Sequence, residues 1–135
     1  MESSVFVAGG AGFIGSNLCY KLSSQYDKVI VVDNLCRGRK SFLEKLDNLV
    51  FIDQDLSQDK STCQLVEDLQ KKYHISEVWH LAANSDIPAG VSDPSIDLRD
   101  TFLTTFSLAN AFEVKPPENF LFASSSAVYG DMGKN

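Results

Sequence analysis

The sequence has 135 residues, of which 44% are hydrophobic and 22% charged, and its 18 acidic and 12 basic residues give a net charge of −6. A chain of this length has room for one domain, which we expect to span residues 1–135. The acidic balance, without any basic run, argues against nucleic acid as a partner.

Five short apolar runs alternate along the chain with longer segments of helical period. The runs lack the alternation of a one-sided sheet, so each is predicted to be a fully buried strand. They cover residues 5–8, 29–32, 49–52, 78–81 and 120–123.

Helices are predicted between these strands. The first covers residues 13–24 and opens directly from a glycine loop. Residues 41–44 have the spacing of a capping box for a short helix. Apolar side chains recur at helical spacing over residues 65–73, and again over residues 93–112 after an Asp-Pro start signal.

Strand and helix in strict alternation predict an α/β fold, a doubly wound parallel sheet of the Rossmann type with helices on both faces. Right-handed crossovers give the expected strand order 3-2-1-4-5. In such a sheet the ligand binds where the order reverses, between strands 1 and 4.

A glycine loop, Gly-Gly-Ala-Gly-Phe-Ile-Gly at residues 9–15, joins the first strand to the first helix. Gly9 would permit the tight turn, Gly12 would let a pyrophosphate approach the helix N–H groups, and Gly15 would let the helix pack closely. A structural turn with chance glycines is the alternative, but the position between strand and helix favours dinucleotide binding. A Walker A loop is excluded, because no Gly-Lys-Ser/Thr follows.

An acidic residue, Asp33, ends the second strand. Its carboxylate can accept hydrogen bonds from the adenosine ribose hydroxyls of NAD. The 2′-phosphate of NADP would meet a like charge instead, and like charges about 4 Å apart near a surface repel by roughly 4 kcal/mol. Arg37, Arg39 and Lys40 could offset part of this repulsion. NAD is therefore the favoured cofactor, and a simple turn residue before Asn34 is the alternative role for Asp33.

Membrane, export and metal signals are missing from the sequence. No apolar run approaches the roughly 18 residues that span a bilayer, and Met1-Glu2-Ser3-Ser4 lacks the basic start of a signal peptide. The scattered Cys19, Cys36 and Cys63 form no Cys-x-x-Cys pair, which disfavours a zinc site and a disulfide framework. We therefore expect a cytoplasmic protein with reduced cysteines, no metal and no membrane partner.

Over essentially the whole chain these motifs resemble the extended short-chain dehydrogenase/reductases, and among them the NAD-dependent epimerase/dehydratase family of UDP-glucose/galactose 4-epimerase type. The glycine loop matches nearly letter for letter. Residues 32–38 resemble the ribose-binding turn, and Asp55-Leu56 the pair beside the adenine. Residues 80–83, His-Leu-Ala-Ala, match the strand 4 motif, and residues 122–130 match the strand 5 motif.

The resemblance implies an NAD site built from all of these motifs and a catalytic hydroxyl. The hydroxyl is that of Ser125, four residues before Tyr129, which would hydrogen-bond the reacting sugar oxygen. Ser124 and Ser126, on either side, are alternatives for this role. The non-catalytic alternative is a plain serine-rich turn after the strand. Ser85 and Asp86 would face the substrate side, and a role as plain surface loop residues is an equal alternative. The residues implied to bind NAD are Gly9, Gly12, Phe13, Ile14, Gly15, Asp33, Asn34, Arg37, Gly38, Asp55, Leu56, Leu81, Ala82 and Ala83.

The chain departs from the family's pattern in places that bear on function. Residues 100–104, Asp-Thr-Phe-Leu-Thr, replace the usual Asn-Val-x-Gly-Thr, and Gln54 stands where glycine is common. The family's acid/base pair, Tyr-x-x-x-Lys, in which lysine lowers the tyrosine pKa, is absent. Four residues after each tyrosine stand Ser24, Ile30, Glu77 and Gly133.

These departures predict a truncated, incomplete domain that lacks later strands and a substrate domain and is inactive alone. Neither His74, expected at a helix end, nor His80, expected in the core, is a convincing base. The apolar edge of the fifth strand is expected to favour self-association.

The resemblance implies an NAD-dependent nucleotide-sugar epimerase or dehydratase. In this reaction a hydride passes to NAD from a sugar carbon, and a keto-sugar forms transiently. Return of the hydride to the other face gives epimerisation, whereas elimination gives dehydration. Two alternatives stay open: an NADPH-dependent reductase of the same fold and a dinucleotide sensor without turnover. A nucleotide sugar is the expected substrate of the full protein, and a homodimer is one expected assembly.

Overall fold

The computed structural model describes residues 1–131 and 133. Its five parallel strands form one sheet in the order β3-β2-β1-β4-β5, so the predicted fold class and strand order are confirmed. The strands are β1 (Ser3–Ala8), β2 (Lys28–Asp33), β3 (Leu49–Asp53), β4 (His74–His80) and β5 (Asn119–Phe122).

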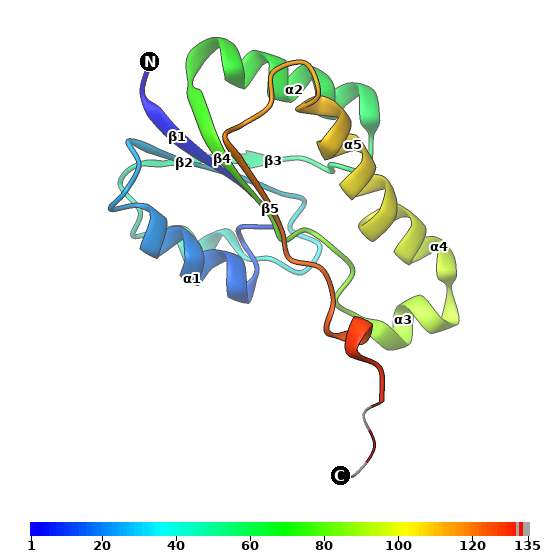
Figure 1. Ribbon diagram of the computed structural model, residues 1–135. Coiled ribbons are helices and arrows are strands. Elements are labelled where there is room, and N and C mark those ends of the chain that lie inside the picture. Colours follow the sequence, from blue (N-terminus) through cyan, green and yellow to red (C-terminus); the bar gives the residue numbers. More distant parts are fainter. Residues whose placement is uncertain (132, 134–135) are drawn as a thin grey trace.

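Helices cover both faces of the sheet, with α1 on one face and α2 and α5 on the other (Figure 1). The α-helices are α1 (Phe13–Leu22), α2 (Asp59–Lys72), α3 (Ile87–Ser92), α4 (Pro94–Asp97) and α5 (Thr104–Ala111). The shorter segments are the 3-10 turns η1 (Lys40–Leu43) and η3 (Ser126–Tyr129) and the π-helical turn η2 (Leu98–Leu103). No helix in these described residues is long and apolar enough to cross a membrane.

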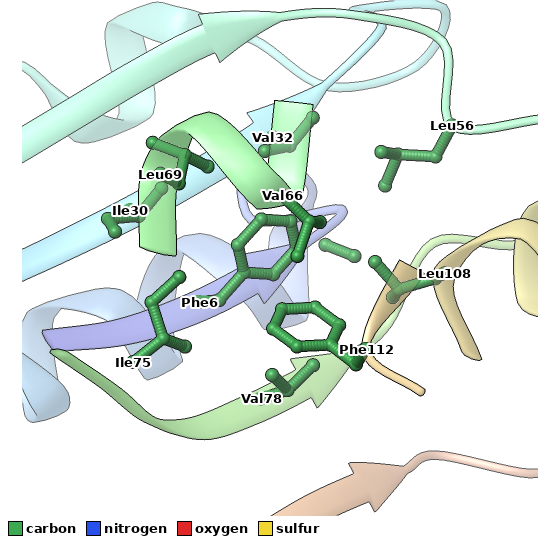
Figure 2. Close-up of a cluster of buried hydrophobic side chains, with 11 residues drawn as sticks. Phe6, Ile30, Val32, Leu56, Val66, Leu69, Ile75, Val78, Leu108 and Phe112 are labelled. Carbon is green, nitrogen blue, oxygen red and sulfur yellow. The ribbon is translucent and has the colours of Figure 1, made fainter. Parts of the chain in front are cut away.

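The central strand β1 contributes to two hydrophobic cores, one on each face. Phe6 and Ala8 enter the core formed with α2 and α5, while Val5 and Val7 enter the core formed with α1. In the first core the rings of Phe6 and Phe112 meet edge-on, with centroids 5.6 Å apart (Figure 2). Both faces of β1 are therefore buried, which explains its unbroken apolar run.

The two edge strands contradict the prediction that all five strands are fully buried. Every side chain of β3 is at least partly exposed. In β5, Phe120 and Phe122 are 38% and 55% exposed. Each edge strand has a hydrogen-bonded neighbour on one side only, so its apolar residues are covered less completely than those of the inner strands.

Two helix predictions differ from the structure in kind. Residues 41–44 form no capping box, because the backbone N–H of Arg39 pairs with Ala11 O at 2.9 Å and η1 begins directly afterwards, without a side-chain cap. The helix predicted over residues 93–112 is divided into α4, η2 and α5. Thr104 donates to the carbonyl of Arg99, five residues back, which widens this turn.

Other boundaries shift, and one helix was not predicted. His74 is the first residue of β4 instead of a helix end, and α3 occupies a stretch with no predicted element. The first helix ends at Leu22, and Asn48 Nδ2 donates to Ser23 O at 3.0 Å just beyond that end. A side chain that is remote in sequence thus satisfies a carbonyl that longer helical pairing would have used.

Candidate functional site

The glycine loop at the carboxyl end of β1 contains two glycines that the fold itself requires. Gly9 has a φ of +77°, and a Cβ there would lie 2.7 Å from Ala82 N. A Cβ at Gly15 would lie 2.3 Å from Gly9 O. Both positions therefore exclude a side chain through backbone conformation or close approach.

Gly12 differs from these two. Its φ of −76° suits any residue, and a Cβ there would have only Gly9 O within 4 Å, at an ordinary 3.5 Å. Gly12 is also the N-cap of α1, and it has no side chain that could cap the helix. The N–H groups of the first helical turn can therefore bind an anion.

A cavity of about 390 Å³ opens beside this loop, at the ends of β1, β2 and β4. It lies where the strand order reverses, since β2 and β4 flank β1 on opposite sides. The cavity wall contains every residue that the resemblance assigned to NAD binding: Gly9, Gly12, Phe13, Ile14, Gly15, Asp33, Asn34, Arg37, Gly38, Asp55, Leu56, Leu81, Ala82 and Ala83.

Asp33 is nearly buried and held at both carboxylate oxygens. Oδ2 accepts a hydrogen bond from Ala11 N at 3.0 Å, and Oδ1 accepts one from Leu35 N at 2.8 Å. The side chain thus ties the glycine loop to the loop after β2 while it also lines the cavity. Sequence reasoning missed the first of these roles.

Two apolar side chains stand out at the start of α1. Phe13 and Ile14 are 82% and 70% exposed, and both line the cavity. Large apolar side chains beside uncapped helix N–H groups form the mixed surface typical of a ligand cleft.

Several residues of the cavity wall were not predicted to bind the cofactor. Gln54 and Asn84 adjoin predicted motifs, so their neighbours in the sequence could have indicated them. Asp100 and Thr104 come from η2 and α5, where no rule about strand ends applies. The additional residues of the wall are Val32, Cys36, Gln54, Asn84, Ser85, Asp100, Thr104 and Ala123.

Asn84 connects the loop after β4 to the helices beside it. Its backbone N–H donates to Thr101 Oγ1 at 3.1 Å, and its Nδ2 donates to Asp97 Oδ1 at 2.9 Å. These bonds hold the segment that carries Asp100 and Thr104 against the cavity. π-helical turns are frequent at functional sites.

The charges of the cavity wall are mostly negative. It includes Asp33, Asp55 and Asp100, whereas Arg37 is its only basic member among the residues that the structure describes. Arg37 forms an ion pair with Asp86. The hydrogen bond from Ala89 N–H, and then Arg37, lower the pKa of the Asp86 carboxyl, which is therefore ionised at neutral pH.

Ser125 lies outside the cavity wall. It is exposed and is the N-cap of η3, where its Oγ accepts a hydrogen bond from Ala127 N at 3.2 Å. From the segment after β5, Ala123 is the residue that lines the cavity.

His80 is 1% exposed and lies in the core, as expected. Its Nε2 lies 2.8 Å from Thr105 Oγ1, which donates its own hydrogen to Thr101 O. The hydroxyl must therefore accept from Nε2–H, and Nδ1 is buried without a partner among the described residues. Burial lowers the pKa of His80 to about 4, so the ring is neutral at pH 7.

Comparison with known proteins gives consistent sequence matches. The model of the NAD dependent epimerase/dehydratase family matches residues 5–135. The chain is 31% identical to a UDP-glucose 4-epimerase of Klebsiella pneumoniae, over 96% of this chain and 94% of that protein. It is 30% identical to the UDP-glucose 4-epimerase of Yersinia pestis, over 94% of this chain but 38% of that protein.

Solved structures agree with these matches. The UDP-glucose 4-epimerase of Brucella ovis in complex with NAD is similar with a TM-score of 0.83 and 33% identity, over 98% of this chain and 38% of that one. The UDP-glucose 4-epimerase of Thermotoga maritima with UDP-glucose gives a TM-score of 0.84 and 28% identity, over 98% of this chain and 41% of that one. With its sheet order, its glycine loop and these matches, the chain belongs to the NAD-dependent epimerase/dehydratase family.

Proposed function

We propose that this chain binds NAD and forms the cofactor-binding portion of a nucleotide-sugar epimerase or dehydratase. The proposal rests on the surroundings of Gly12. The fold would accept a Cβ at this position, yet Gly12 borders the cavity at the N-terminus of α1. The absence of a side chain there therefore serves a ligand, and an anionic pyrophosphate suits the helix end.

Other parts of the cavity wall suit the remaining parts of the dinucleotide. Asp33 would offer carboxylate oxygens to ribose hydroxyls, and Asp55 and Leu56, which also line the cavity, would contact the adenine as the family resemblance implies. Residues 81–83 would run past the cofactor beyond β4. Bound NAD would supply reversible hydride acceptance from a sugar carbon.

A UDP-sugar is the proposed substrate class of the full protein, because the relatives and solved neighbours are named as UDP-glucose 4-epimerases. Ser125 remains the proposed hydroxyl that orients the reacting sugar oxygen. For that role its O–H would donate to the sugar oxygen, while Oγ can keep the hydrogen bond that it accepts from Ala127 N. No tyrosine is followed at the fourth position by lysine, so the proposal assigns this chain cofactor binding and not proton transfer.

Isothermal titration with NAD and NADP tests the proposal. Saturable binding of NAD, with weaker binding of NADP, is the expected result. If NAD does not bind, the proposal is wrong, and tighter binding of NADP would favour the reductase alternative.

A turnover assay tests the assignment of proton transfer. Incubation of the chain with NAD and UDP-glucose should yield neither NADH nor a new sugar nucleotide, since general acid–base catalysis typically contributes about 10²- to 10⁴-fold. Turnover by this chain would require a base among its own residues and would contradict that assignment.

A further inference from the structure

Arg37 and Asp86 join two loops that lie on opposite sides of the glycine loop. Arg37 follows β2 and lines the cavity, whereas Asp86 follows β4. Because β2 and β4 both flank β1, the ion pair spans the two sides of the switch point.

Asp86 is held in place independently of Arg37. It is the N-cap of α3, and its Oδ1 accepts a hydrogen bond from Ala89 N at 3.0 Å. Its backbone N–H donates to Asn84 Oδ1 at 2.9 Å, and Asn84 Nδ2 donates to the Asp86 carbonyl at the same distance. Its Oδ2 accepts from Arg37, whose side chain is 57% exposed. The aspartate is thus the fixed partner, and it orients the arginine.

No other cation in the described part of the chain lines this cavity. The two basic residues that follow Arg37 lie elsewhere, with Arg39 over the Phe42 ring at 6.0 Å and Lys40 over the Phe51 ring at 5.1 Å. Arg37 is therefore the wall's one candidate partner for a phosphate group near Asp33.

We propose, on the basis of the proposed dinucleotide function, that Asp86 is a specificity-determining residue. By holding Arg37 it withholds the cation that would otherwise pair with the 2′-phosphate of NADP. Arginine–phosphate pairs are charge-assisted and often bidentate, so the loss of this pair weakens the binding of NADP in particular. NAD carries a hydroxyl at the same position and needs no cation there. Asp86 therefore adds to the preference for NAD that Asp33 establishes.

The test is the Asp86→Asn variant, titrated with NAD and with NADP. Asparagine keeps an oxygen that can cap α3 but removes the charge that holds Arg37. The dissociation constant for NADP should fall about fivefold to tenfold, where tenfold corresponds to about 1.4 kcal/mol. The dissociation constant for NAD should stay within about twofold.

Two further variants make the result specific. Asp93→Asn is the matched control, because Asp93 is the N-cap of the neighbouring α4, accepts from Ser95 N at 3.0 Å and lies outside the cavity wall. It should leave the ratio of the two affinities unchanged. In the double variant Asp86→Asn/Arg37→Gln, the gain in affinity for NADP should disappear.

Three outcomes would overturn the proposal: an unchanged ratio in Asp86→Asn, an equal gain for both cofactors, or a gain that persists in the double variant. An equal gain would place Arg37 at the pyrophosphate. Failure of the proposed function itself is distinguishable, since the unsubstituted chain would then bind no NAD at all.

Discussion

At the scale of single residues, the glycine loop contains two positions at which the fold excludes a side chain and one, Gly12, at which it does not. Added Cβ atoms at Gly9 and Gly15 would meet backbone atoms closer than 3 Å, whereas one at Gly12 would meet nothing closer than 3.5 Å. These distances agree with the separate roles expected for the turn at Gly9 and for close packing at Gly15, and they show that the fold leaves space for a side chain at Gly12.

Gly12→Val is therefore expected to abolish NAD binding and to keep the sheet folded. Its free energy of unfolding should change by no more than about 1 kcal/mol, the usual scale of N-cap effects. Isothermal titration and urea unfolding measure the two quantities. Gly15→Val is the contrasting variant and should not fold stably, because its Cβ would lie 2.3 Å from Gly9 O. Unchanged affinity in Gly12→Val would show that the loop is only a turn.

His80 gives a prediction for the dependence of stability on pH. Its pKa is lowered to about 4 in the folded chain and is about 6.5 when unfolded. Between these values the unfolded chain binds more protons, so stability is complete above about pH 6.5 and falls as the pH decreases toward 4. From pH 7.5 to pH 5 the loss should be about 2 kcal/mol, measured by urea unfolding.

His80→Gln tests the assignment of this loss, since its amide can still donate to Thr105 but does not titrate. Its stability should depend less on pH over this range, while His74→Gln, at the exposed start of β4, should keep the dependence. The pKa values of Asp68, Asp86 and Asp93 are also lowered. They affect stability mainly below this pH range, because unfolded aspartate titrates near pH 4. If His80→Gln behaves as the unsubstituted chain does, another group causes the loss.

At the scale of elements, the segment from α4 to α5 shows how one stretch of helix serves both core and cavity. Leu108 in α5 is fully buried in the core against α2, whereas Leu98 in η2 is 55% exposed. The π-helical turn begins at Leu98 and carries Asp100, which lines the cavity.

Leu108→Ala should lower the free energy of unfolding by about 3 kcal/mol, because it removes buried methyl groups and leaves a cavity. Leu98→Ala is the same substitution on the exposed side and should cost less than about 0.5 kcal/mol. The midpoints of urea unfolding measure both changes, provided that the slope of the unfolding free energy against urea concentration stays constant. Equal effects at the two positions would contradict the assignment of the buried face.

At the scale of the whole molecule, β5 leaves an edge with unpaired backbone groups and partly exposed Phe120 and Phe122. Such an edge favours pairing with another chain. We expect the mass from light scattering to rise with concentration. Phe122→Lys should reduce this association, because a charge on an edge strand opposes pairing.

Val114→Lys is the control for this experiment. Val114 is 95% exposed but lies outside every strand, so the substitution changes apolar surface and charge without changing the edge. Its association should match that of the unsubstituted chain. A monomeric mass at all concentrations would show that the edge does not self-associate.

Local patterns in the sequence were sufficient for the sheet and for much of the cavity. Apolar runs separated by helical periods predict β1 to β5 and their order, because parallel strands need right-handed crossovers. The glycine loop and Asp33 follow strand ends directly, and the ends of parallel strands meet at one edge of the sheet. Their convergence on the cavity could therefore be predicted from position along the chain alone.

Tertiary structure decided the features that depend on segments remote in sequence. The exposure of β3 and β5 depends on which strands are outermost and what covers them. An apolar run in the sequence does not indicate whether its strand lies at the edge or in the middle of the sheet. The bond from Asn84 to Asp97 joins the loop after β4 to α4, 13 positions further along the chain. The pairing of Arg37 with Asp86 joins residues 49 positions apart, and charges along a chain do not reveal their partners until the strands have brought them together.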